Sequence, residues 1–100
     1  MSQAKDNEWS LYILQCDAKL YTGIALDPIK RFKEHLSKSS RSARFTRTAS
    51  HIELIYSVKL GEKAIAMRAE RKIKTLPRKK KDFIVTQQLG CEELLAYLNL

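Results

Sequence analysis

The alternation of apolar and polar positions predicts two short strands near the start of the chain. Successive residues of EWSLYILQC fall on opposite sides of an extended chain, Trp9, Leu11 and Ile13 on one side and Ser10, Tyr12 and Leu14 on the other. KLYTGIA, residues 19–25, reads as a second strand. Cys16-Asp17-Ala18 leaves room for a tight turn, so we expect a β-hairpin.

Two registers of this hairpin are possible. A turn centred on Cys16 and Asp17 sets Tyr12 opposite Tyr21, and a turn centred on Asp17 and Ala18 sets Tyr12 opposite Gly23. Both place the two tyrosines on one face, because side chains alternate with a period of two. A three-residue turn would separate them, and the sequence leaves the register open.

Asp27-Pro28 is typical of a helix start, with an N-cap acceptor before a proline at the first helical position. The helix is expected to run to about Ser37, with an apolar stripe of Ile29, Phe32 and Leu36. Arg31 and His35 are spaced i, i+4 and are therefore neighbours on a different stripe.

The rest of the chain predicts a third strand and three further helices. SKSSRSARFTRTAS reads as a loop with room for one helical turn, HIELIYSVK as a strand and EKAIAMRAERKIKTL as a helix. The core-facing stripe of that helix is Ile65, Ala69, Ile73 and Leu76, with Glu70 at its border. Pro77 stops or bends it, RKKKDFIVTQQL forms the next helix, and Gly90 separates that from CEELLAYLNL.

The expected fold class is α+β, with a three-stranded antiparallel β-sheet flanked by helices in the order β-β-α-β-α-α-α. At 100 residues a single domain is expected: a polar lead-in over residues 1–8, then one domain over 9–100, with its core at about 9–85 and a C-terminal helix at about 91–99.

Positive charge is concentrated in two segments. Lys and Arg number 19 against 11 Asp and Glu, which gives a net charge of +8. Seven of the basic residues lie between Lys30 and Arg47 and eight between Arg68 and Lys81. This segregation favours a polyanionic partner, with a merely solubilising surface as the alternative. The expected nucleic-acid contacts are Arg41, Arg44, Arg47, Arg71, Lys74, Arg78, Lys79, Lys80 and Lys81.

Other classes are disfavoured. The apolar runs are too short for a membrane-spanning helix, and the N-terminus lacks an apolar signal core, so a cytoplasmic protein is expected. Cys16 and Cys91 read as two free thiols rather than a disulfide, and no zinc site is indicated.

Tyr12, Tyr21, Arg31, His35 and Glu70 together could hydrolyse a phosphodiester bond. Tyrosine and histidine can act as bases, arginine grips phosphate bidentately, and one glutamate can anchor an Mg²⁺ ion that keeps most of its waters. Taken singly, each has a structural explanation, such as a helix ion pair of the glutamate with Lys74 or Arg71.

These residues give the chain a resemblance to the GIY-YIG nucleases, over about residues 9–85. Ser10-Leu11-Tyr12 takes the place of the first triplet and Tyr21-Thr22-Gly23 that of the second. Arg31 and His35 match positions of the family's first helix, and Glu70 matches its metal-binding glutamate. The resemblance is to a small stand-alone bacterial type.

The resemblance implies a DNA endonuclease that uses one Mg²⁺ or Mn²⁺ ion in repair or recombination. Tyr12 would be the general base or would position the attacking water, with Tyr21 assisting. Arg31 would stabilise charge on the phosphate, His35 would orient nucleophile or phosphate, and Glu70 would hold the metal. The DNA could be branched or single-stranded, and a partner protein could supply specificity.

The sequence also departs from the family pattern. The first triplet keeps only its tyrosine, and the asparagine that many members carry some dozen residues beyond the glutamate is not found. Either the small type does without it, or Asp82 or Gln87 substitutes, or activity is weak. One alternative is a nucleic-acid-binding module of the same fold without efficient cleavage. Another is an RNA- or ribosome-associated protein whose tyrosines stack on bases. For Gly23 we expect a structural role, because a side chain there would crowd metal or substrate.

Overall fold

The computed structural model describes residues 7–37 and 49–100. Its first two strands, β1 (Trp9–Cys16) and β2 (Lys19–Ala25), form the predicted antiparallel hairpin. The turn is centred on Asp17 and Ala18, and Tyr12 lies opposite Gly23. This is one of the two registers that the sequence left open. Asp17 has a φ of 55°, a left-handed conformation that Asp tolerates better than most residues.

Asp17 also ties this turn to the segment that enters the third strand. Its carboxylate accepts hydrogen bonds from the backbone N–H groups of Ser50 and His51, at 3.0 and 2.9 Å. The third strand, β3 (Ile52–Gly61), pairs antiparallel with the other edge of β1, so the sheet order is β2-β1-β3. The pairing register shifts between Ile13 and Leu14, where β3 carries an irregularity. The predicted α+β fold with a three-stranded antiparallel sheet is confirmed.

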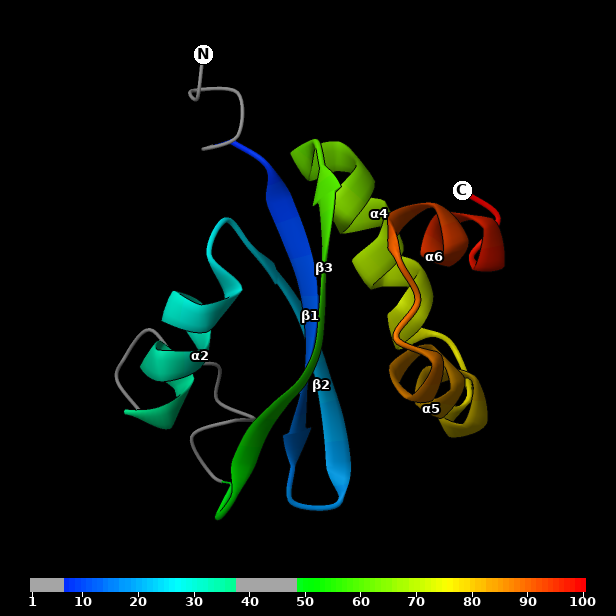
Figure 1. Cartoon of the computed structure of the whole chain (residues 1–100). Coiled ribbons are helices and arrows are strands. Elements are labelled where there is room, and N and C mark those ends of the chain that lie inside the picture. The colour runs from blue at the N-terminus through cyan, green and yellow to red at the C-terminus, as the bar shows by residue number, and fades with distance from the viewer. Residues whose placement is uncertain (1–6, 38–48) are drawn as a thin grey trace.

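Helices cover both faces of the sheet (Figure 1). Helix α2 (Pro28–Leu36) lies on one face, and α4 (Lys63–Lys74), α5 (Arg78–Gln87) and α6 (Cys91–Tyr97) lie on the other. The central strand β1 is therefore buried on both sides, and its residues 11–14 are at most 1% exposed. Burying an apolar residue stabilises a fold by about 1.5–3 kcal/mol, so β1 contributes strongly to both halves of the core.

The larger half of the core lies under α4, α5 and α6. Leu11 and Ile13 of β1 contact the buried Ala69 and Ile73 of α4, and each of the two later helices adds a buried residue, Ile84 and Leu94. Ala66 is also fully buried, so the predicted stripe of α4 is present but includes one alanine more. Pro77 separates α4 from α5 as expected, since proline is disfavoured inside a helix.

The face of helix α2 that packs on the sheet differs from the apolar stripe that the sequence predicted. The predicted N-cap forms: the Asp27 carboxylate accepts a hydrogen bond from the backbone N–H of Lys30 at 3.1 Å. However, Ile29 and Leu36 are 60% and 49% exposed, whereas His35 is fully buried. The predicted apolar face was wrong at these two positions. Pairing of His35 with a polar group beneath the helix, described below, gives this burial its physical reason.

Some expectations fall outside the described residues. Most of the predicted loop SKSSRSARFTRTAS does so, together with Arg41, Arg44 and Arg47 and most of the N-terminal lead-in. Within residues 7–37 and 49–100, Cys16 and Cys91 are both free thiols, and no helix has the length and apolar character needed to cross a bilayer.

Candidate active site

Three aromatic side chains from three elements meet under α2. Tyr12 comes from β1, Tyr21 from β2 and His35 from α2, and the centroid of the His35 ring lies 6.1 Å from that of Tyr12 and 5.4 Å from that of Tyr21. The centroids of the two tyrosines are 6.4 Å apart. The Tyr12 hydroxyl is hydrogen-bonded to His35 Nε2 at 3.1 Å. The structure thus brings together three of the predicted site residues on one face of the sheet.

Burial shapes the chemistry of Tyr12. Its side chain is 1% exposed, and burial is the main reason that its pKa is raised to about 12, with a further upward effect from Tyr21. Arg31 opposes this rise with its positive charge and a hydrogen bond. The effect of burial is larger than that of Arg31, so the net shift of the Tyr12 pKa is upward. At neutral pH Tyr12 is therefore a neutral phenol.

His35 is neutral at the same pH. Burial lowers its pKa, the Arg31 guanidinium lowers it further, and the carboxylate of Glu34 partly compensates. A neutral imidazole can accept the hydroxyl proton of Tyr12 at Nε2 or donate to the hydroxyl oxygen, according to its tautomer. The two side chains thus form a buried, uncharged, hydrogen-bonded pair, which avoids the large cost of a buried unpaired charge.

Arg31 lies at the border between this pair and solvent. Its guanidinium donates to the Glu34 carboxylate with Nη1 and Oε1 2.9 Å apart, and its side chain is 27% exposed. A guanidinium carries five N–H donors, so most of them remain for another ligand. A cavity of about 220 Å³ adjoins it, and its lining is Ala25, Leu26, Asp27, Lys30, Arg31 and Glu34.

Gly23 is placed where no side chain fits. A Cβ atom there would lie 2.5 Å from the Tyr12 hydroxyl oxygen and 2.7 Å from its Cζ, closer than real Cβ contacts. The expected crowding is real, but the group that would be crowded is the Tyr12 ring, which lies across from Gly23 in the hairpin. The glycine therefore makes room for the tyrosine.

Glu70 belongs to α4, and its carboxylate lies 3.2 Å from Nζ of Lys74, its i+4 neighbour. The helix ion pair that was named as the structural explanation of Glu70 is therefore present. Its side chain is 24% exposed. Its negative charge also contributes to raising the Tyr12 pKa, so its field reaches the aromatic group. Within the described residues no group of three or more His, Cys, Asp and Glu could hold a metal ion. A single partly exposed carboxylate still fits Mg²⁺, which commonly keeps several waters.

The two proposed substitutes for the family asparagine lie elsewhere. Asp82 and Gln87 are exposed residues of α5, on the opposite face of the sheet from α2 (Figure 1). Asp82 pairs with Arg78, with its Oδ1 2.9 Å from Nε. Neither residue is therefore placed beside Tyr12, Tyr21 and His35.

The predicted nucleic-acid contacts that the structure describes lie on α4 and α5. Arg71, Lys74, Arg78, Lys79 and Lys80 are exposed and Lys81 is half-buried. Arg78 has fewer N–H groups left for DNA, since its Nη1 donates to the backbone carbonyl of Ala18 at 2.9 Å and its Nε pairs with Asp82.

Comparison with known proteins agrees with this geometry. The sequence matches the model of the GIY-YIG catalytic domain over residues 8–82, and the chain therefore belongs to the GIY-YIG family, a family of nucleases. More particularly, it is similar to UPF0213 proteins, which are small bacterial proteins. The one from Citrobacter koseri is 38% identical over 92 residues, and UPF0213 protein YhbQ from Escherichia coli K12 is 35% identical, each alignment covering 91% of this chain and 90% of the relative.

A solved structure is similar as well. The solution NMR structure of the UPF0213 protein BH0048 from Bacillus halodurans is 34% identical in sequence and has a TM-score of 0.53. The match covers 87% of this chain and 92% of that one. The resemblance to a small stand-alone bacterial type is thus confirmed.

Sequence reasoning missed two features of the site. It did not anticipate that Glu34 would bind Arg31, although their i, i+3 spacing is a usable signal. It also did not anticipate the burial of His35. No local sequence signal predicts this burial, because the partner of His35, Tyr12, lies 23 residues away in the sequence.

Proposed function

We propose that this protein is a metal-dependent endonuclease that hydrolyses phosphodiester bonds in DNA and acts in repair or recombination. The observation that carries the proposal is the meeting of Tyr12, Tyr21 and His35 under α2, with Arg31 beside them and the charge of Glu70 acting on Tyr12. A purely structural core would fill this space with apolar side chains, which cost less to bury.

The geometry supports distinct roles for these residues. Tyr12 is a neutral, buried phenol, so it suits positioning of the nucleophile better than general-base catalysis. His35 fixes its hydroxyl, and the half-buried Tyr21 extends the pair toward solvent. Arg31 would bind the phosphate with the N–H groups that Glu34 leaves available.

Glu70 would hold one Mg²⁺ or Mn²⁺ ion. When bound, such an ion supplies charge stabilisation at the phosphate and a more acidic water. The ion pair with Lys74 would then open, since ammonium and metal would compete for the same carboxylate.

The substrate follows from charge rather than from base contacts. A net charge of +8 favours sequence-independent binding to phosphates. We therefore propose DNA as the partner, including branched or single-stranded DNA, in the cytoplasm, with a partner protein supplying any target specificity.

The test is replacement of Glu70 by alanine. Duplex, single-stranded, flap and branched DNA are incubated with the parent and variant in Mg²⁺ or Mn²⁺, with EDTA as the blank. We expect the parent to cut, and Glu70→Ala to fold, bind DNA at least as well and fail to cut. Glu62→Ala is the matched control, because it removes the same charge from an exposed site at the start of the same helix.

The competing function is nucleic-acid binding without cleavage. The 1% exposure of Tyr12 and the pairing of Glu70 with Lys74 favour it. In that case, loss of Glu70 would cost only the ion pair, about 0.5 kcal/mol or less. A folded Glu70→Ala protein that cuts at the parental rate would contradict the metal-binding role of Glu70, and a parent that cuts nothing in the panel would contradict the nuclease proposal.

A further inference from the structure

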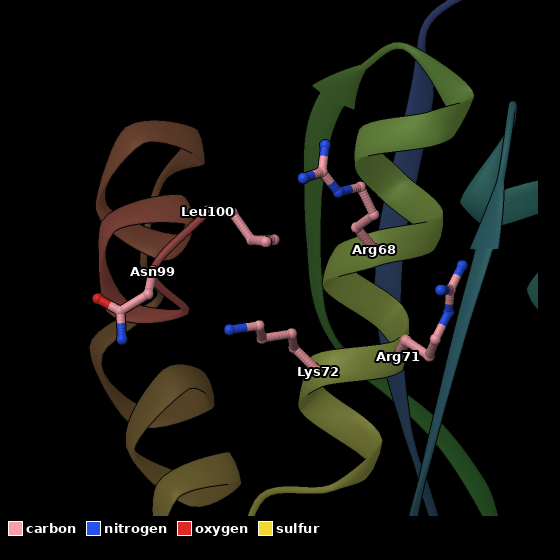
Figure 2. Close-up of a pocket in the computed structure, with 5 residues that line it drawn as sticks. All are labelled: Arg68, Arg71, Lys72, Asn99 and Leu100. Atoms are coloured by element: carbon pink, nitrogen blue, oxygen red, sulfur yellow. The ribbon is translucent and has the colours of Figure 1, made fainter.

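A second cavity lies on the other side of the molecule, between α4 and the residues that follow α6. Its volume is about 380 Å³, and it is lined by Arg68, Arg71, Lys72, Asn99 and Leu100. In Figure 2, Lys72 and Leu100 extend into the gap from opposite sides, and Arg71 lies toward the strands. Three of the five lining side chains are therefore cations and none of the five side chains is acidic.

Within residues 7–37 and 49–100, some of the cations on and around α4 and α5 have an acidic partner and others do not. Lys74 pairs with Glu70, Arg78 with Asp82 and Lys59 with Glu8. For Arg68, Arg71 and Lys72, no ion pair is found with any acidic side chain of the described segments. Like charges repel, so three such groups around one cavity raise the local positive potential and favour an anion between them.

Spacing along α4 explains how the three residues reach one cavity. Arg68 and Lys72 are i, i+4 neighbours, and Arg71 is i+3 from Arg68, so all three occupy adjoining positions on the helix surface. Asn99 lies across the gap from α4, at a φ of 60°, a left-handed conformation that Asn tolerates, and its side chain points away from Lys72 in Figure 2. The Leu100 side chain adds an apolar surface.

We propose that this cavity binds a phosphate group of a nucleic-acid strand. A guanidinium binds two phosphate oxygens at once, and an ammonium adds a point charge. The volume lies within the range of ligand pockets and exceeds what a single phosphate fills, so the adjoining sugar has room beside Leu100. A free nucleotide would offer the same phosphate chemistry, and the experiment below separates the two sources.

The cavity is separated from the aromatic part of the candidate active site, although Glu70 shares α4 with the cationic lining residues. It lies on the α4 and α6 side of the sheet, whereas Tyr12 and His35 meet under α2 on the other side (Figure 1). The phosphate held here is therefore not the one that would be cleaved. This inference extends the proposed function by adding a second contact to the strand, but it requires only binding.

The first experiment measures phosphate binding without metal. Inorganic phosphate, a 5′-mononucleotide and a short single-stranded oligonucleotide are titrated into ¹⁵N-labelled protein in EDTA. Shifts are expected to centre on Arg68, Lys72 and Asn99. The double variant Arg68→Ala with Lys72→Ala should weaken oligonucleotide binding by about tenfold or more, because two charge-assisted hydrogen bonds to phosphate can no longer form.

The matched control removes two charges elsewhere. Lys33→Ala with Lys63→Ala takes the same charge from exposed residues that line neither cavity. Its effect on the oligonucleotide should be severalfold smaller, and phosphate should still shift the Asn99 signals. Equal losses in the two double variants would overturn the proposal, because only overall charge would then matter.

Introducing a negative charge gives a second test of the site that does not depend on removing side-chain bulk. Asn99→Asp puts a carboxylate on a residue that lines the cavity and whose left-handed conformation Asp also tolerates. It should abolish the phosphate shifts, whereas Asn7→Asp, at an exposed site in the N-terminal segment, should not. Unchanged phosphate binding in a folded Asn99→Asp protein would overturn the site.

The titrations with the mononucleotide and the oligonucleotide also identify the source of the phosphate. Binding of the oligonucleotide at least tenfold tighter than the mononucleotide assigns the site to a strand, and tighter binding of the mononucleotide overturns that assignment. Failure of cleavage is a separate outcome: a protein that cuts no DNA but binds phosphate at Asn99 loses the proposed function and keeps this site.

Discussion

Tyr12 and Gly23 show how one small residue determines the place of a large one. They face each other across the hairpin, and the ring of Tyr12 occupies the space that a Cβ on Gly23 would take. The hydroxyl of the same tyrosine is hydrogen-bonded to His35 of α2. At this scale, the glycine of the second triplet is explained by packing on a tyrosine, with no need of a substrate.

Gly23→Ala should therefore destabilise the protein by about 1–3 kcal/mol, as overpacking does. Elsewhere in a strand the same change tends to stabilise, since glycine is entropically costly. Gly90→Ala is the control, because its new Cβ would lie 3.6 Å from the nearest atom. Urea unfolding measures both. Adding Tyr12→Phe, which removes the closest clashing atom, should recover part of the loss, and strict additivity would argue against the clash.

Tyr12→Phe should slow cleavage by about tenfold to a hundredfold, the value of one or two hydrogen bonds in a transition state. Because the Tyr12 pKa is raised to about 12, only about one molecule in a thousand carries the phenolate at pH 9. The loss should thus be the same from pH 6 to 9, measured as single-turnover rates.

Tyr56→Phe is the control for that change, since Tyr56 is also buried and donates its hydroxyl proton to the Leu89 carbonyl at 2.6 Å. If the parent shows an alkaline rise that Tyr12→Phe abolishes, Tyr12 is the base and its positioning role is wrong.

Helix α2 docks on the sheet through polar as well as apolar contacts. Its buried residue is His35, half-buried Phe32 joins the apolar cluster of β1, and Ile29 and Leu36 remain exposed. The helix thus gives up some apolar burial in order to place an imidazole on a phenol and a guanidinium beside them. At the scale of the element, this is the cost of building a site into a core.

This arrangement predicts acid sensitivity. The pKa of folded His35 is lowered, so below pH of about 6.5 the unfolded chain binds a proton that the folded chain does not. The contribution to stability is full above that pH and is lost as pH falls toward the folded pKa. Denaturant unfolding from pH 8 to 5 should show the parent losing stability more steeply than His35→Gln.

His51→Gln serves as the control for this experiment, because the imidazole of His51 is 76% exposed. Its unfolding curves should keep the parental dependence on pH. Parallel curves for the parent and His35→Gln would mean that the pKa of His35 is not lowered in the folded protein.

At the scale of the whole molecule, the sheet separates two kinds of surface. The face under α2 carries the aromatic group and Arg31, and the opposite helices carry Arg68 to Lys81, the larger of the two basic segments (Figure 1). DNA bound by charge would therefore contact α4 and α5 whatever its sequence.

Binding should weaken steeply between 50 and 200 mM salt, because phosphate contacts release counterions. Replacing Lys79, Lys80 and Lys81 with alanine should weaken binding on every sequence and reduce the slope of log K against log salt by up to about 0.9 for each phosphate that is no longer neutralised. Fluorescence anisotropy on two unrelated oligonucleotides measures both. An affinity that is constant over this range would contradict the electrostatic basis of binding.

The elements, their order and the family were all predictable from the sequence, because each depends on local signals. Alternation marks β1, Asp27-Pro28 begins α2, and a helical stripe marks α4. The five candidate site residues were also proposed from the sequence, by their residue types and order, and their roles stay a prediction.

The tertiary structure alone decided the register, the burial and the charge states. Tyr12 lies opposite Gly23 because the turn falls at Asp17 and Ala18, and Asp17 holds that turn through backbone groups 33 and 34 residues away. His35 is buried because α2 packs on β1, where its hydrogen-bond partner Tyr12 lies 23 residues earlier in the sequence. The pKa of Tyr12 rises because helices and neighbouring strands exclude water from it. These properties depend on contacts between distant segments, and no local pattern in the sequence encodes them.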